Sequence, residues 1–198
     1  MYYQDGKGSS TQMDEAVRAV TGLVNHETHA FNSWTEYHAL YAQNLPTYQT
    51  APTNAIQRDL TTRTEKEHSY RFEYPRLLRS AFMHPSIPKG QEGVPSYQRL
   101  EFLGDALLDM TAVNHLARSY NGKDPGWLTE HKMAMVSNRF LGALCVRLGF
   151  HRHLHHSHPS LLTQITDYVV EIQEAEEKSE GRRDYWTTTV RDAPKVSA

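Results

Sequence analysis

Apolar residues recur every three or four positions over most of the chain, which is the spacing of amphipathic helices. In the first third we expect a helix over about 12–25 and a second one over about 33–43, where the letters SWTE match a capping box. The segment 44–54 holds two prolines and is expected to be an extended linker. A polar helix is expected from about 54 to 68.

The character of the chain changes from residue 75 onwards. Pro75 suits the first turn of a helix over PRLLRSAFM. A loop with three prolines and two glycines follows over 84–96. The remaining expected helices cover about 97–119, about 127–148 with a break at Ser137-Asn138 where Asn138 would cap, and about 160–178. We find no alternating strand pattern and no internal repeat, so the predicted fold class is all-α.

The segment YQRLEFLGDALLDM, residues 97–110, is predicted to be a buried helix because apolar residues cover most of its circumference. A narrow strip on it carries Gln98, Glu101, Asp105 and Asp109. Glu101 and Asp105 are one helical turn apart, so their carboxylates are neighbours that repel each other. A divalent cation would offset this repulsion, and Mg²⁺ prefers carboxylate oxygens. An ordinary solvated helix edge is the alternative, and the spacing alone favours it.

Four motifs occur in an order that points to one family. QRLEFLGDALLD resembles the signature of ribonuclease III endonucleases, and its flanking matches are LLRSAFMHPS (77–86), MVSNRFLGALCVRLGF (135–150) and DAPKV (192–196). TEHKMAMVSN and the acidic insert before GRRDYW resemble the fungal Dicer-like type. The resemblance covers about 71–198. Residues 1–70 resemble the tail of an upstream ribonuclease III domain followed by an inter-domain linker.

The resemblance implies Mg²⁺- or Mn²⁺-dependent hydrolysis of double-stranded RNA in RNA silencing. Glu101 matches the metal-binding glutamate of the family, and Asp105 matches the catalytic aspartate, which helps to hold the metal and its water. Lys195 matches a lysine implied to position phosphate. Gln98 and Asp109 receive no catalytic role, and Asp109 is expected to be solvated or paired.

The resemblance also implies a protein partner. In the family, two ribonuclease III domains pair so that each cuts one strand. The pair forms within a longer protein or as a homodimer. Phe102 and Leu103 lie in the segment that would contribute to this contact.

A second acidic pair, Asp-x-x-Glu, follows the segment matched by PKV in the family, whereas this chain ends at PKVSA. We therefore expect the helical domain of 71–198 to be incomplete at its C-terminus, to expose apolar helix faces, and to have little or no activity alone. Asp167 and Glu171 repeat the four-residue spacing but are expected to form a solvated edge.

Two further hypotheses stay open. One is a non-catalytic helical module that binds RNA or an intact ribonuclease III domain. The other is a divalent-cation-binding helical protein of unrelated role.

The composition limits the kinds of site and the cellular location that we expect. The 198-residue chain has 21 Lys and Arg against 23 Asp and Glu, so any contact with nucleic acid must be a local patch. Cys145 is the only cysteine, which excludes a disulfide framework and a cysteine-based zinc site. There is no apolar run of ~20 residues and no secretory signal. We expect an intracellular protein, cytoplasmic or nuclear, without membrane contact.

The tract HRHLHHSH, residues 151–158, holds five histidines. A polar loop is the favoured interpretation, and metal binding is the alternative.

Overall fold

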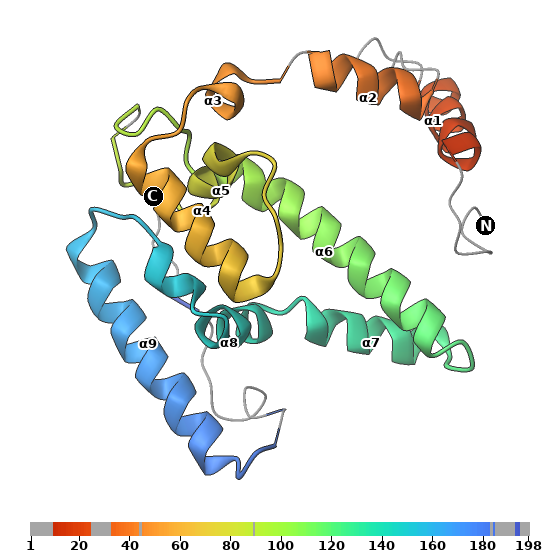
Figure 1. Ribbon diagram of the computed structural model, residues 1–198. Helices are drawn as coiled ribbons and strands as arrows, with labels where there is room; N and C mark the ends of the chain where they lie inside the picture. Colours follow the sequence, from red (N-terminus) through yellow and green to blue (C-terminus); the bar gives the residue numbers. More distant parts are fainter. Residues whose placement is uncertain are drawn as a thin grey trace. The chain divides into compact units, whose positions relative to one another are not determined.

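The computed structural model describes residues 10–24, 33–43, 45–88, 90–182, 184 and 193–194 (Figure 1). These residues form helices and loops without a strand, and an isolated bridge joins Met83 to His155. The predicted all-α fold class is confirmed. The chain divides into two compact units, Met1–Ala51 and Pro52–Ala198.

The first unit contains α1 (Ser10–Val24), α2 (Trp34–Gln43) and the single-turn helix α3 (Thr47–Thr50). The start of α2 follows the predicted capping box, because Ser33 Oγ accepts a hydrogen bond of 2.9 Å from the Glu36 amide. The Asp14 carboxylate of α1 accepts a second hydrogen bond, of 3.4 Å, from the Thr35 amide. Side-chain acceptors at a helix start satisfy amides that have no partner within the helix.

The prediction of an extended segment over 44–54 is wrong at α3. Pro46 has φ −54° and precedes the turn, and the amides of Gln49 and Ala51 donate to the carbonyls of Pro46 and Thr47 at 2.8 and 3.0 Å. A fixed proline φ suits the start of a helical turn as well as an extended chain. The presence of proline alone therefore did not distinguish the two.

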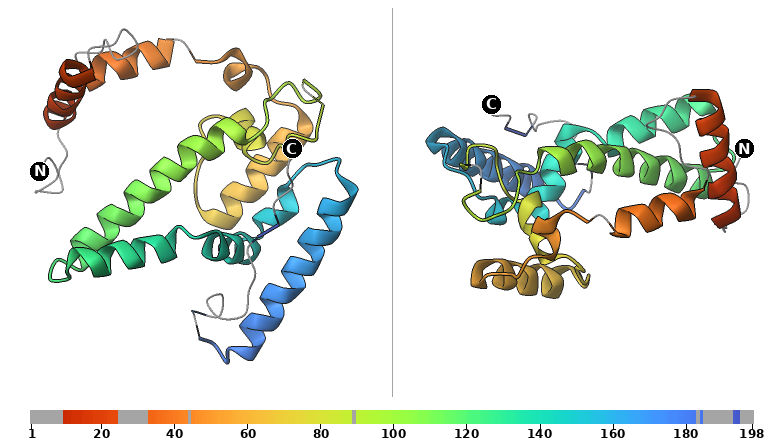
Figure 2. Two further views of the ribbon diagram at one scale, coloured as in Figure 1. Left: turned by 180° about the vertical axis from the view of Figure 1, so that it is seen from behind. Right: turned by 90° about the horizontal axis from the view of Figure 1, so that it is seen from above.

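The second unit carries the remaining helices. They are α4 (Ala55–His68), α5 (Pro75–Ala81), α6 (Gln98–Ser119), α7 (Pro125–Met135), α8 (Asn138–Arg147), the 3₁₀ helix η2 (Phe150–His153) and α9 (Pro159–Lys178). Figures 1 and 2 show α6 and α7 side by side as a helical hairpin. Further contacts join α4 to α5, α5 to α6, and α8 to α9.

Local signals set most of these boundaries. Asn54 caps α4 through a reciprocal pair of hydrogen bonds with Gln57, at 2.8 and 3.1 Å. The predicted break between α7 and α8 is present, but Ser137 rather than Asn138 is the N-cap. Ser137 has an extended ψ of 146°, which directs its Oγ to the Phe140 amide at 3.2 Å. Gly149 ends α8 in the left-handed region, at φ 73°.

One part of the core of the second unit lies between α8 and α9. Ala143, Tyr168, Ile172 and Ala175 form its buried cluster, with Val146 and Ala193 packed against it. The apolar face predicted for α9 is thus the one that the structure buries. Gly142 permits the approach of the two helices, because a Cβ there would lie 2.9 Å from Ala193 Cβ and would overlap Tyr168 Oη.

The prediction that α6 is buried is wrong. Its buried residues are Ala112 and Leu116, whereas Phe102, Leu103 and Leu107 are 84%, 55% and 59% exposed. In the part of the second unit that the structure describes, α6 contacts α7 and α5, but Phe102 and Leu103 near its start stay exposed. The expected exposure of apolar helix faces is therefore confirmed on α6.

We expect Gly142→Ala to destabilise the second unit by about 1–3 kcal/mol, since the added methyl group overpacks the contact between α8 and α9. Urea unfolding followed by circular dichroism measures this change. Gly104→Ala in α6 is the matched control, because a Cβ there meets nothing within 4 Å and alanine favours helix by up to about 1 kcal/mol. Equal effects of the two substitutions would contradict the proposed packing.

Candidate functional site

The two central acids of the strip lie open on α6. Glu101 is in the first turn and Asp105 is one turn later, and both side chains are exposed. Within the described residues, neither carboxylate accepts a hydrogen bond or joins an ion pair. The Glu101 charge still acts locally, since burial and then this carboxylate raise the pKa of Tyr97. The oxygen lone pairs of both acids are therefore available to an external ligand.

The two outer residues of the strip are engaged. Asp109 accepts a hydrogen bond of 2.9 Å from Lys132 Nζ of α7, in a partly exposed ion pair. Gln98 Oε1 accepts one of 3.2 Å from Ser96 Oγ. Of the two states expected for Asp109, solvated or paired, the structure shows the paired one.

The chemistry of Glu101 and Asp105 suits a hard divalent cation, because carboxylate oxygens are preferred ligands of Mg²⁺ and Mn²⁺. Over the ranges that the structure describes, no three His, Cys, Asp or Glu side chains gather closely enough to hold a metal ion. A cation on α6 would therefore have two side-chain ligands from these ranges, with water or another molecule completing its coordination. Asp167 is exposed on α9, as expected for a solvated edge, whereas Glu171 is half-buried and departs from that expectation. Lys195 lies outside the described residues.

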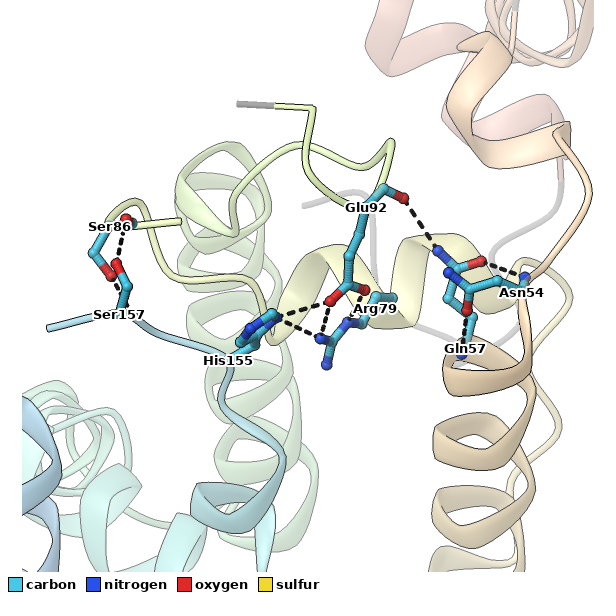
Figure 3. A network of polar contacts seen from close by, with 7 residues as sticks. All are labelled: Asn54, Gln57, Arg79, Ser86, Glu92, His155 and Ser157. Carbon is cyan, nitrogen blue, oxygen red and sulfur yellow. Dashed lines mark hydrogen bonds and ion pairs between the residues drawn. The ribbon is translucent and has the colours of Figure 1, made fainter. Parts of the chain in front are cut away.

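A buried ion pair holds the loop that leads into α6 (Figure 3). Arg79 Nε of α5 donates to Glu92 Oε2 at 2.6 Å, and the two side chains are 8% and 10% exposed. His155 Nδ1 lies 2.8 Å from Glu92 Oε1 and 2.6 Å from Arg79 Nη2. When protonated, this nitrogen donates to Glu92, and when unprotonated it accepts from Arg79. Helix α5, the loop and the histidine tract therefore meet at one charged cluster.

Side chains of α4 and α5 also hold the backbone of this loop. Their hydrogen bonds to loop carbonyls are Gln57 Nε2 to Glu92 at 3.4 Å, Arg76 Nη2 to Gly93 at 2.6 Å, and Ser80 Oγ to Pro95 at 2.8 Å. Gly93 adopts φ 65°, and a Cβ there would lie 2.9 Å from Arg76 Nη2. The path of the chain into the first turn of α6 is thus set by contacts far away in the sequence.

The histidine tract packs against the loop HPS, residues 84–86. The amide of His84 donates to the His155 carbonyl at 2.9 Å, and Ser157 Oγ donates to the Ser86 carbonyl at 2.6 Å (Figure 3). His84 Nδ1 also accepts the Ser86 amide at 3.0 Å. No metal-ligating group of three residues exists among the described ones, which include the whole tract. The tract therefore makes structural contacts, and η2 occupies its first three residues, where the expected polar loop is wrong.

The protonation of this region follows from its burial. Burial is the main cause that lowers the pKa of three histidines, namely His84, His151 and His153. The hydrogen bond from Arg79 lowers the pKa of Glu92 more than burial raises it. Burial therefore favours the neutral form of these imidazoles, and Arg79 favours the charged form of the Glu92 carboxylate.

The segment that begins with α6 has a recognisable sequence. Residues 98–194 match the family model of the Ribonuclease III domain, which includes Glu101 and Asp105. The chain belongs to the ribonuclease III family. The predicted family is therefore confirmed. By family, the chain belongs to a class of endoribonucleases.

Fungal relatives of this ribonuclease III chain support the Dicer-like type. It is 51% identical over 197 residues to Dicer-like protein 1 of Phaeosphaeria nodorum, covering 100% of this chain and 13% of that protein. It is 53% identical over 188 residues to Dicer-like protein 1 of Aspergillus oryzae, covering 95% of this chain and 12% of that protein. The chain thus spans a small part of these relatives. None of its described helices has the length and apolar character of a membrane span.

Sequence reasoning did not find the cluster of Arg79, Glu92 and His155. Arg79 and Glu92 are separated by 13 positions, and Arg79 and His155 by 76. No periodic pattern links residues at such separations. The sequence indicated only the proline- and glycine-rich loop before α6. Such a loop needs contacts with other segments if it is to fix the start of the helix.

We expect Glu92→Gln to destabilise the second unit by about 3 kcal/mol, because it leaves the buried Arg79 charge without its counter-charge. Chemical unfolding at neutral pH measures this loss. Glu174→Gln on α9 is the control, since Glu174 pairs with Lys178 while both are more than half exposed, and such pairs contribute about 0.5 kcal/mol or less. A loss at Glu92 no larger than at Glu174 would refute the structural role of the cluster.

Proposed function

We propose that this chain contributes part of the nuclease centre of a Dicer-like protein that hydrolyses double-stranded RNA in RNA silencing. The observation that carries the proposal is the pair of open carboxylates, Glu101 and Asp105, in the segment that matches the ribonuclease III domain. The cofactor would be Mg²⁺ or Mn²⁺. The substrate and the pathway are inferred from the family and from the longer Dicer-like relatives.

Glu101 and Asp105 would hold the cation from one side of α6. When bound, such a cation polarises the phosphodiester and makes a bound water more acidic. The Asp105 carboxylate, free of partners in the described chain, would accept a hydrogen bond from the attacking water and orient it. We assign Glu101 to metal binding, and Lys195 to the positioning of phosphate.

We further propose that the chain alone cleaves RNA little or not at all. Phosphodiester hydrolysis on a divalent ion requires several groups that fix the ion and orient the water. The described residues supply two such carboxylates in one place and no third ligand beside them. The remaining ligands would come from residues outside the described ranges or from a longer protein.

We expect Mn²⁺ to broaden the amide NMR signals around Glu101 and Asp105 selectively. Glu101→Gln and Asp105→Asn should each weaken this binding at least about tenfold, because each removes one of two carboxylate ligands. Asp109→Asn on the same helix is the control, since Asp109 is already paired with Lys132. Absence of selective broadening would exclude the metal site.

A cleavage assay tests the second half of the proposal with the same variants. Double-stranded RNA incubated with the chain and Mg²⁺ should stay intact. Robust cleavage that Glu101→Gln abolishes would keep the site but refute the proposed inactivity of the chain alone.

A second candidate function is a partner-binding module. The observation in its favour is the exposed apolar surface of α6, which includes Phe102, Leu103 and Leu107. Burying one such side chain on association contributes about 1.5–3 kcal/mol. We propose that this surface pairs with another ribonuclease III domain, within a longer protein or as a homodimer.

We expect Phe102→Asp to weaken self-association, or capture of an intact ribonuclease III domain, at least about tenfold, because it places a charge in the contact. Sedimentation velocity and a pull-down measure the two. Leu162→Asp is the control, since Leu162 is 61% exposed on α9. A wild-type chain that stays monomeric and captures neither the domain nor RNA would exclude this function.

A further inference from the structure

A basic pocket lies where α4, α8 and η2 meet, and none of its lining residues belongs to α6. Its volume is about 530 Å³. The ionisable residues of its wall are Arg63, Glu67, His68, Arg147, Arg152 and His153. Three guanidinium groups thus share the pocket with a single carboxylate and two imidazoles.

Two of the arginines have unused hydrogen-bond donors. The side chains of Arg147 and Arg152 are exposed, and neither contacts an acid or a hydrogen-bond acceptor among the residues that the structure describes. Arg63 pairs with Asp59 at 2.9 Å, with both side chains more than half exposed. Exposed pairs of this kind are weak, so Arg63 can exchange its partner at small cost.

The rings of the two histidines pack against aromatic side chains. The ring of His68 lies edge-on to Phe150, with 4.8 Å between centroids, and that of His153 lies edge-on to Phe82 at 5.5 Å. Both Nε2 atoms are 4.0 Å from a Glu67 carboxylate oxygen, which is too far for a hydrogen bond. His68 Nε2 is buried and has no hydrogen-bond partner within the described residues.

The charges of the pocket affect the pKa of His153. Burial lowers the pKa of His153 most, Glu67 raises it, and Arg63, His68 and Arg152 lower it further. Positive charge from α4 and from η2 therefore converges on this ring. An anion in the pocket would oppose that effect and favour the protonated imidazole.

We propose that this pocket binds a phosphate group through Arg147 and Arg152, with Arg63, His68 and His153 as further donors. Guanidinium groups bind phosphate through two parallel hydrogen bonds, and imidazole adds a directional donor. The last turns of α4 and α8 also end here, and their carbonyls carry partial negative charge. The side chains rather than the backbone must therefore hold the anion.

The phosphate could belong to an RNA backbone or be free, and both present the same oxygens. The RNA source rests on the proposed function, because double-stranded RNA is recognised largely through phosphate and 2′-hydroxyl contacts. The two sources can be separated by experiment.

The first experiment uses the full chain and inorganic phosphate at constant ionic strength, followed by imidazole NMR. We expect saturable shifts of the His68 and His153 signals and a higher pKa of His153 with phosphate. The double variant Arg147→Gln/Arg152→Gln should weaken this binding at least tenfold. Arg182→Gln is the control, because Arg182 is 72% exposed and pairs with Asp184 outside the pocket. Unchanged histidine signals, or equal effects of both variants, would overturn the proposal.

The second experiment measures binding of double-stranded RNA against salt concentration. Loss of one or two phosphate contacts lowers the slope of log K against log[salt] by about 1–2, so the double variant should show this drop and Arg182→Gln should not. If the wild type responds to phosphate but does not bind RNA, the pocket is supported as a site for free phosphate. The same result would count against the proposed function. RNA binding with equal slopes and no phosphate response overturns the pocket alone.

Discussion

The buried ion pair between Arg79 and Glu92 is the interaction on which the second unit most depends. Both side chains are nearly inaccessible to water, so each charge would be strongly disfavoured without the other. The pair joins α5 to a loop rich in proline and glycine, and His155 adds a third segment. One polar cluster thus determines how three separate parts of the chain approach one another.

The consequence for α6 is a helix that is fixed at its base and open along its side. The loop delivers its first turn, and the contact between Asp109 and Lys132 holds it to α7. Between these points, the described part of the unit leaves apolar and acidic side chains of α6 uncovered. The same exposure makes the carboxylates accessible to a cation and the apolar side chains accessible to a protein partner.

The second unit carries negative charge on α6 and positive charge around a separate pocket. Glu101 and Asp105 of α6 are exposed and unpaired within the described residues, which suits the binding of a cation. The arginines of α4, α8 and η2 line a pocket, which we propose to bind an anion. The proposed function would use both, because RNA is a polyanion and a bound cation would activate the scissile phosphate. The slightly negative net charge of the chain conceals this separation.

Local chemistry made much of the helical structure predictable from the sequence. The capping residues Ser33 and Asn54 and the left-handed Gly149 act within one or two turns, so their effects are visible in the letters. The family and the acidic residues of α6 were also predictable, because the motif QRLEFLGDALLD is specific. The roles of Glu101, Asp105 and Lys195 remain predictions.

The tertiary structure alone decided which surfaces are covered and which charges are paired. An apolar helix such as α6 is buried only if another element lies against it, and its own sequence does not say whether one does. The pairing of Arg79 with Glu92, and the convergence of arginines near His153, join residues without a common periodicity. Periodicity and capping report interactions between near neighbours, whereas these contacts arise only when distant segments of the chain pack together.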